Sequence, residues 1–328
     1  MLDAPGRRGA VTIARRFAPV HLLAVALVGA LACGRGPTQV ANPDFEVAIA
    51  DPAFSAERAG EAAPPRVCVD EAHHNFHTVD GRYAPFAAVL RADGLRVVAS
   101  TAPFTAEALA ACDVLVIANA LNERNQSEWS LPTPSAFTPD EIAAVKAWVG
   151  GGGGLWLIVD HMPFPGAAGE LAGAFGFELA NGFAVRSGHQ GPDLFTRADG
   201  SIAAHPITDG AGPEEAVTQV ATFTGHAFKA PDTAAPILVL PAGFVSLEPA
   251  VAWQFDDKTP RRDVGGWAQA ATVEAGRGRV ALFGEAAMFT SQVTGDGAAT
   301  GLDHPDAKGN LRLLRNVVRW LVAAPRPG

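Results

Sequence analysis

Strand-like and helix-like patterns alternate along most of this chain, and that alternation constrains the fold more than any other feature. Short apolar runs occupy residues 66–69, 96–99, 113–118, 155–159 and 278–283, and helical patterns occupy 83–90, 105–111, 138–149 and the stretch from 310 onward. Alternation of this kind predicts an α/β fold with a doubly wound, mainly parallel sheet and helices on both faces. Residues 181–275 break the pattern with short apolar segments and frequent Gly and Pro, which favours a partly antiparallel insertion.

The clearest helix start is Thr138-Pro139-Asp140-Glu141, which combines a capping Thr, Pro at the first helical position and Glu three residues later. Five glycines, 150–154, end this helix and precede a strand. Phosphate-binding loops run in the opposite order, from strand to glycines to helix, so we interpret this run as a flexible connection.

The first 32 residues have the pattern of an export signal. Four arginines precede an apolar run of about a dozen residues, too short for a membrane span, and the run ends in Ala30-Leu31-Ala32-Cys33. This ending resembles the lipobox of bacterial lipoproteins, which implies lipidation of Cys33. The alternative is a plain cleaved signal peptide in which Cys33 has no role. We favour the lipoprotein, because a secreted protein has little use for an unpaired exposed thiol.

The rest of the chain is acidic, because the net charge is −9 and residues 1–32 contain four Arg and one Asp. This balance argues against nucleic acid as a partner and leaves a lipid anchor as the membrane contact. Residues 33–65 have the composition of a disordered tether, and residues 66–324 are expected to form one folded domain. We expect a location in the bacterial cell envelope, facing the periplasm or exterior.

Cys68 and Cys112 lie in the expected folded domain. They could form a disulfide if the strands that they introduce are neighbours, since the expected compartment permits it. We expect instead two buried thiols.

Polar residues follow three of the expected strands. They are expected to converge, because parallel strands place their carboxyl ends at one edge of a sheet, where ligands bind. We predict Asp70, His73, Asp160, His161 and Glu285 as catalytic residues, and His74, Asn75, Asn119 and His226 as ligand-binding residues.

Two chemistries suit these residues. One is a divalent metal site (zinc, manganese or iron) built from His73, His77, Asp160 and His161, although their spacing matches no standard zinc signature. The other is metal-free acid–base chemistry or sugar binding, in which carboxylates accept hydroxyl hydrogens and aromatic rings stack on the ligand. Trp129, Phe164 and Trp253 are candidates for such stacking, although core packing is the more common role of large aromatics.

A third interpretation gives these polar groups a purely structural role. Asp70 would accept backbone N–H groups, His205 would fix the turn before Pro206, and His226 would be a hydrogen-bonded buried imidazole. We expect His189 and His304 to be structural in this sense.

Several segments together resemble the class I glutamine amidotransferase-like superfamily. They are Asp70-Glu71-Ala72-His73, residues 204–210 (AHPITDG), residues 222–226 (TFTGH), residues 276–289 (GRGRVALFGEAAMF), and Asn316 with Trp320 in the last helix. More closely, the chain resembles an uncharacterised bacterial branch related to trehalose-utilisation-type proteins and domains near gliding-type transport proteins. The resemblance implies a flavodoxin-like sheet and favours carbohydrate as the ligand.

The glutaminases of this superfamily carry a nucleophilic Cys after the strand that corresponds to residues 155–159, whereas this chain has Asp160-His161 there. The resemblance therefore implies that the chain is not a glutaminase. We predict an envelope domain that binds a small polar or saccharide ligand. The sequence leaves open whether it hydrolyses that ligand, as a hydrolase using carboxylate and histidine or metal chemistry. The alternative is a non-catalytic protein-interaction module of the envelope.

Overall fold

A computed structural model of the chain describes residues 39–55, 63–294 and 297–323. Its centre is a nine-stranded sheet with the order β3-β2-β4-β5-β15-β14-β10-β6, to which β11 adds by pairing with β14. Neighbouring strands from β3 to β15 pair in parallel, and β14, β10, β6 and β11 continue the sheet in antiparallel pairs. The strands are β2 (Arg66–Asp70), β3 (Arg96–Ser100), β4 (Val114–Ala118), β5 (Gly154–Ile158), β6 (Glu178–Leu179), β10 (Phe228–Lys229), β11 (Ala235–Val239), β14 (Ala268–Ala275) and β15 (Gly278–Phe283). The fold is thus mixed α/β with a large mixed sheet and helices, as the sequence predicts.

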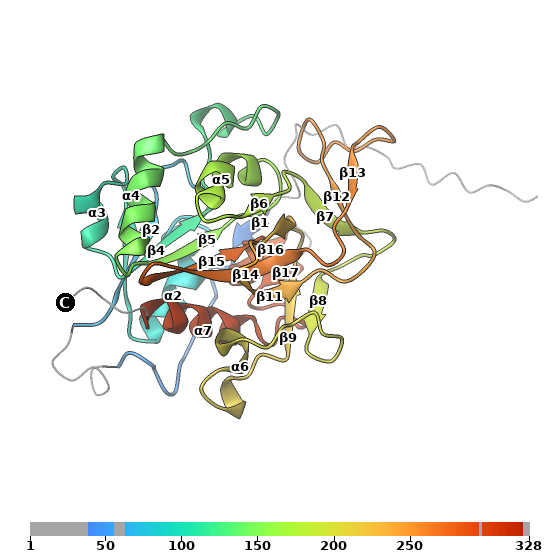
Figure 1. The fold of residues 1–328 in the computed structure, drawn as a ribbon. Coiled ribbons are helices and arrows are strands. Elements are labelled where there is room, and N and C mark those ends of the chain that lie inside the picture. The colour runs from blue at the N-terminus through green and yellow to red at the C-terminus, as the bar shows by residue number, and fades with distance from the viewer. Residues whose placement is uncertain (1–38, 56–62, 295–296, 324–328) are drawn as a thin grey trace, which may run out of the picture. The chain divides into compact units, whose positions relative to one another are not determined.

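Helices pack against both faces of this sheet (Figure 1). Successive strand residues point to opposite faces, so Val67 and Val69 belong to one core cluster while Cys68 belongs to the other. The first cluster includes side chains of α2 (Ala84–Ala92) and α7 (Asn310–Val322), and the second those of α3 (Ala106–Ala110), α4 (Pro139–Gly150) and α5 (Phe164–Gly173). Within the described residues, no helix is long and apolar enough to span a bilayer.

Helix α4 begins where the sequence predicts. The Thr138 hydroxyl accepts a hydrogen bond from the Glu141 backbone N–H, and the Glu141 side chain accepts one from the Thr138 N–H, which completes a capping box. The capping box fixes the position of Glu141 beside the end of β2, where this side chain has a second role described below.

The stretch expected to be an insertion contains several small antiparallel pairs. One three-stranded sheet has the order β13-β12-β7, and β8 pairs with β9. Their bounds, with those of the short helix that follows β8, are β7 (Phe183–Arg186), β8 (Asp193–Thr196), α6 (Pro206–Asp209), β9 (Gln219–Thr222), β12 (Phe244–Leu247) and β13 (Arg261–Asp263). These elements bring residues 183, 226 and 253 to the neighbourhood of the β5 end, as described below.

Residues 39–55 depart from the tether predicted for 33–65. Strand β1 (Gln39–Ala41) pairs with β16 (Ser291–Thr294), which also pairs with β17 (Ala299–Gly301). Further on, Phe45, Val47, Ile49 and Phe54 pack on the core cluster of α2 and α7. Composition alone does not show that these four apolar side chains reach the core. The predicted lipidation site, Cys33, and the signal 1–32 lie outside the described residues.

Cys68 and Cys112 form a disulfide, with 5.8 Å between their Cα atoms, so the expectation of two free thiols is wrong. Strands β2 and β4 are direct neighbours with Cys68 opposite Leu115, and Cys112 lies two residues before the start of β4. Strand adjacency decided the pairing, and spacing in the sequence does not reveal it.

Candidate functional site

The end of β2 carries a fully bonded group of polar side chains, which we call the His73 cluster (Asp70, His73, Asn75 and Glu141). His73 Nδ1 lies 2.9 Å from both carboxylate oxygens of Asp70, and His73 Nε2 lies 2.9 Å from Glu141 Oε1. Since carboxylates only accept, both ring nitrogens donate and the ring is an imidazolium. Asn75 Nδ2 donates to Asp70 Oδ2 at 2.9 Å.

The charges of the His73 cluster stabilise each other. Burial lowers the pKa of His73, but the hydrogen bonds and charges of Asp70 and Glu141 outweigh it and raise that pKa above 6.5. Burial alone raises the pKa of Glu141, whereas hydrogen bonds from Thr138, His73 and the Phe104 N–H bring it down to about 2. The cluster therefore joins the end of β2 to the start of α4 and leaves His73 no lone pair for a metal or substrate.

The end of β5 carries a second group, which we call the His161 cluster (Asp160, His161, His226, Trp253 and Glu285). The Asp160 N–H donates to Asn119 Oδ1 at 2.8 Å, and Asp160 Oδ1 accepts the His161 N–H at 2.7 Å. His161 Nδ1 donates to the Met162 carbonyl at 2.8 Å, so in the neutral ring Nε2 carries the free lone pair. Both side chains keep about a tenth of their surface exposed, at 11% and 10%.

Glu285 lies beneath this pair, fully buried at the end of β15. Its carboxylate oxygens accept the N–H groups of Ala287 at 2.8 Å and Met288 at 2.7 Å. Burial and the charge of Asp160 raise the pKa of Glu285 well above its ordinary value, against these backbone donors. Burial, Glu285 and Asp160 also raise the pKa of Tyr83, whose hydroxyl donates to the Ala286 carbonyl at 3.2 Å.

Two buried imidazoles flank the cluster and are neutral. His77 Nδ1 accepts from Asn119 Nδ2 at 3.1 Å, and burial, with the charges of Arg82 and His161, lowers its pKa to about 3. His226 Nδ1 donates to the Val159 carbonyl at 3.0 Å, and burial lowers the pKa of His226 to about 3. His226 Nε2 is buried and has no partner within the described part of the chain.

Aromatic rings surround His161. Phe183 stacks on it with ring centroids 4.4 Å apart, Trp253 meets it edge-on at 4.6 Å, and Trp129 and Phe164 lie at 6.0 and 6.1 Å. Trp129 and Trp253 are half-buried, and Trp253 Nε1 is a buried donor to which no described residue offers an acceptor. A carboxylate that is about a tenth exposed and two buried atoms without a partner among the described residues thus belong to one cluster with aromatic neighbours.

Backbone strain gathers near both clusters. Within the described ranges, the non-glycine residues with positive φ are His74 (48°), Asn119 (51°), Thr224 (126°) and Trp253 (66°). Asn119 bonds Asp160, Trp253 packs on His161, and Gly225, the residue after Thr224, leaves less room beside Glu285 than a Cβ would need. Such strain costs on the order of 1–3 kcal/mol per residue and tends to occur at functional sites.

The structure divides the predicted site residues between the two clusters. Asp70, His73 and Asn75 belong to the His73 cluster, and Asp160, His161, Glu285 and His226 belong to the His161 cluster with Asn119 beside it. His74 is exposed, and its side chain forms no hydrogen bond with a described residue of either cluster.

The four predicted metal ligands are divided in the same way. His73 has both ring nitrogens bonded to carboxylates, whereas His77, Asp160 and His161 lie at the other cluster. Within residues 39–55, 63–294 and 297–323, no three His, Cys, Asp or Glu side chains are grouped to hold a metal ion.

Sequence reasoning missed three contributors to these clusters. Glu141 was recognised only as a helix cap, Tyr83 only as part of an apolar stripe, and Arg82 not at all. The capping box could have drawn attention to Glu141, because a Glu fixed at a helix start is a ready partner for a nearby imidazole. No local signal identifies Tyr83, whose role depends on the distant Glu285.

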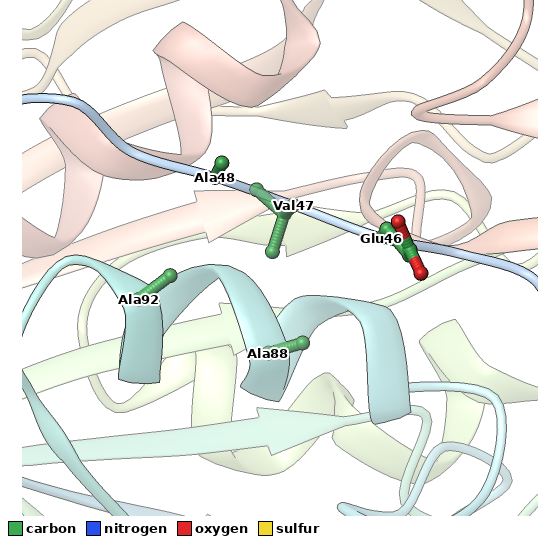
Figure 2. A pocket seen from close by; sticks show the side chains of 5 residues that line it. All are labelled: Glu46, Val47, Ala48, Ala88 and Ala92. Atoms are coloured by element: carbon green, nitrogen blue, oxygen red, sulfur yellow. The ribbon is translucent and has the colours of Figure 1, made fainter.

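Two cavities lie away from these clusters. One, of about 620 Å³, runs between residues 46–48 and helix α2 and is lined by Glu46, Val47, Ala48, Ala88 and Ala92 (Figure 2). The other, of about 520 Å³, lies where the parallel strands β4 and β5 begin, beside the glycine run 150–154, and thus away from the strand ends that carry the clusters. Neither is lined by imidazole or paired carboxylates, so we place the candidate site at the His161 cluster on chemical grounds.

No family model matches the sequence, and no curated protein matches it. Among solved structures, the chain is similar to the mmIFT52 N-terminal domain, at 14% identity and a TM-score of 0.54, over 80% of this chain and all of that one (100%). It is also similar to a protein from Bacteroides uniformis ATCC 8492 described as ThuA-like, at 14% identity and a TM-score of 0.46, over 80% of this chain and 94% of that one. A cytoplasmic protein from Salmonella typhimurium LT2 has 15% identity and a TM-score of 0.46, over 78% of this chain and 99% of that one. At these identities the likeness concerns the fold alone.

Proposed function

We propose that this domain binds a small polar or saccharide ligand at the His161 cluster. The observation that carries the proposal is a pair of buried hydrogen-bonding atoms in the His161 cluster to which no described residue offers a partner: the Nε2 of His226 and the Nε1 of Trp253. Buried polar atoms are normally bonded, so unpaired donors and acceptors gathered at one place favour a partner from outside the chain.

The chemistry of the cluster suits hydroxyl groups. Asp160 keeps part of its carboxylate open and can accept hydroxyl hydrogens, while the imidazole lone pairs of His161 and His226 accept further ones. The half-buried rings of Trp129 and Trp253 can stack on the apolar face of a sugar ring. Asp160 and His161 can also accept a proton from water, so hydrolysis is the reaction class to test.

We further propose that the domain is flavodoxin-like and doubly wound, and derives from an amidotransferase-like ancestor without the nucleophilic Cys. The strand order β3-β2-β4-β5-β15, with helices packed on both faces, supports this arrangement. Asp160 then occupies the position after β5 where the superfamily's nucleophile belongs. Ligands of open parallel sheets bind at that edge.

We propose a cell-envelope location, with Cys33 lipidated and the domain facing the periplasm or exterior. The disulfide between Cys68 and Cys112 supports an oxidising compartment. Mass spectrometry of the membrane fraction tests this directly, because a Cys33→Ser variant should lose the acyl mass and leave the membrane.

The test of ligand binding is a titration of the purified protein with neutral and acidic mono- and disaccharides, monitored by tryptophan fluorescence and calorimetry. Trp129 and Trp253 should report binding, and Asp160→Asn should abolish it while leaving the thermal unfolding curve in place. A full panel without any binding would contradict the proposal.

A second candidate is a protein-interaction module. The exposed side chains of Leu131 and Phe255, 48% and 43% accessible, are close in sequence to Trp129 and Trp253, and the Leu131 N–H donates to the Ala250 carbonyl. An apolar surface of this kind can dock another protein. If so, Leu131→Ser and Phe255→Ser would remove partner binding, while Asp160→Asn would not.

A further inference from the structure

Arg82 is a fixed and partly buried cation next to the His161 cluster. Its Nε donates to Gln292 Oε1 at 3.2 Å, and its Nη2 donates to the Gln39 carbonyl at 3.1 Å. Its guanidinium also lies over the Phe76 ring, 4.2 Å from the centroid. These three contacts hold the guanidinium in one orientation, and three of the five N–H groups of the side chain have no acceptor among the described residues.

No carboxylate within the described part of the chain forms an ion pair with Arg82. Burial lowers the pKa of its guanidinium, and no neighbouring charge is among the causes. In a chain of net charge −9, a half-buried arginine without a counter-ion is unusual, because removing a cation from water is costly unless an anion compensates it.

Arg82 is connected to His161 by aromatic side chains. Phe76, beneath the guanidinium, lies 5.3 Å from Trp129, and Trp129 lies 6.0 Å from His161. His77 provides a second connection, because the charges of both Arg82 and His161 act on it. Trp129 therefore contacts both His161 and Phe76, the ring that carries the Arg82 guanidinium.

We propose that the ligand of the His161 cluster is an acidic sugar, and that Arg82 binds its anionic group. This inference rests on the proposed function, since it names the class of saccharide that the cluster takes. The planar fork of a guanidinium matches a carboxylate or a phosphate with two parallel hydrogen bonds, and the two prearranged contacts reduce the entropy lost on binding. Sugar carboxylates and sugar phosphates share this feature, because both carry negatively charged oxygen atoms on the sugar.

The test compares neutral and acidic sugars on the same full-length protein. Glucose, galactose, glucuronate, galacturonate and glucose 6-phosphate are titrated into the wild type, Arg82→Gln, Arg82→Lys and Arg91→Gln. Arg91 is the matched control, because it is an exposed arginine at the end of the adjacent helix α2. The thermal unfolding curve of each variant shows whether a loss of binding comes from a loss of folding.

We expect the preferred acidic sugar to bind the wild type at least about tenfold more tightly than its neutral counterpart, as one charge-assisted contact provides. Arg82→Gln should remove this preference without changing the affinity for the neutral sugar, Arg82→Lys should keep part of it, and Arg91→Gln should keep all of it. Comparison of the uronates with glucose 6-phosphate identifies the anionic group. The preference should also weaken as salt is added.

Equal affinities of the wild type for acidic and neutral sugars would overturn the inference and leave the proposed function standing. A preference that survives Arg82→Gln would overturn it as well, because another cation would then be responsible. If no sugar of either kind binds, the proposed function itself fails.

Discussion

The His73 and His161 clusters are both built from carboxylates and imidazoles at the ends of parallel strands, yet they use their polar atoms differently. Both nitrogens of His73 are bonded to carboxylates of the chain itself. Around His161, by contrast, the Nε2 of His226 and the Nε1 of Trp253 are buried without a partner among residues 39–55, 63–294 and 297–323, and about a tenth of the Asp160 side chain is exposed. Similar residue types thus form a structural clamp in one place and a candidate binding site in the other.

This difference shows that the number of imidazoles in a segment is a poor guide to chemistry. The segment 70–77 contains three of the nine histidines of the chain, but its His73 and His77 side chains are directed into separate surroundings. Hydrogen-bond satisfaction separates a structural cluster from a functional one more sharply than composition does. The following predictions test the comparison, from the largest expected effect to the smallest.

Removing the disulfide should have the largest effect on stability. Cys68 lies two residues before Asp70, and the bond to Cys112 spans 44 residues, so the Cys68→Ala, Cys112→Ala variant should lose about 4 kcal/mol of unfolding free energy. Urea unfolding measures this loss, and reduced wild type should show the same value. Ligand affinity at the His161 cluster should be unchanged in the folded fraction, and a parallel loss of affinity would mean that the two clusters are not separable.

Replacing His73 should have the next largest effect. His73→Gln leaves Asp70 and Glu141 buried without their cation, which should cost about 3 kcal/mol of unfolding free energy at pH 6. The exposed neighbour offers a matched control, because His74→Asn keeps a residue that tolerates positive φ and should change stability by less than about 0.5 kcal/mol. Equal losses of unfolding free energy in His73→Gln and His74→Asn would contradict the structural role assigned to His73.

The clusters should also respond to pH in opposite directions. His226 has a folded pKa of about 3, against 6.5 when exposed, so between these values the unfolded chain binds a proton that the folded chain does not. Its contribution to unfolding free energy therefore falls as pH decreases, by up to about 1.4 kcal/mol per unit. His226→Gln should flatten the slope between pH 6 and 4, measured by urea unfolding. An unchanged slope would mean that His226 is charged in the folded protein.

The contribution of His73 to the unfolding free energy should decrease as pH rises. Its folded pKa is raised above 6.5, so its stabilising contribution is complete below pH 6.5 and is lost as pH rises through the folded value. His73→Gln should therefore differ most from the wild type at pH 5–6 and least at high pH. A difference that grows with pH would contradict the imidazolium clamp.

A small effect on stability, together with a clear effect on binding, is expected for Trp253. Its Nε1 has no acceptor among the described residues, so Trp253→Phe keeps the ring beside His161 and breaks no hydrogen bond of the chain. Unfolding free energy should change by less than about 1 kcal/mol, while affinity for the preferred sugar should fall about tenfold, corresponding to one hydrogen bond. If Trp253→Phe lost much stability but kept its affinity for the sugar, the Trp253 indole would have a packing role and no role in binding.

Much of the fold could be predicted from local patterns. The apolar runs of β2, β4, β5 and β15 and the capping box of α4 give those elements almost at their observed bounds. The packing of residues 39–55 was not predicted, although Phe45, Val47 and Ile49 alternate with more exposed residues, as the side chains of an extended segment do. The disulfide also depended on strand order, which no single pattern specifies.

The candidate site could be predicted only in part. The strand-end rule selected Asp160, His161 and Glu285, and the structure places Asp160 close enough to Glu285 for its charge to raise the pKa of that carboxyl. It also grouped Asp70 and His73 with them, because the rule does not say which strand-end side chains are bonded to one another. The partners Glu141 and Tyr83 come from distant positions, and only the folded structure brings them in.

The central claim is that the His161 cluster binds a ligand and the His73 cluster does not. One calorimetric comparison tests it: titration of the preferred sugar into wild type, Asp160→Asn and His73→Gln under conditions where circular dichroism shows each to be folded. We predict that Asp160→Asn loses binding with normal stability, and that His73→Gln keeps the wild-type affinity with reduced stability. Wild-type affinity in Asp160→Asn together with lost binding in folded His73→Gln would contradict the account.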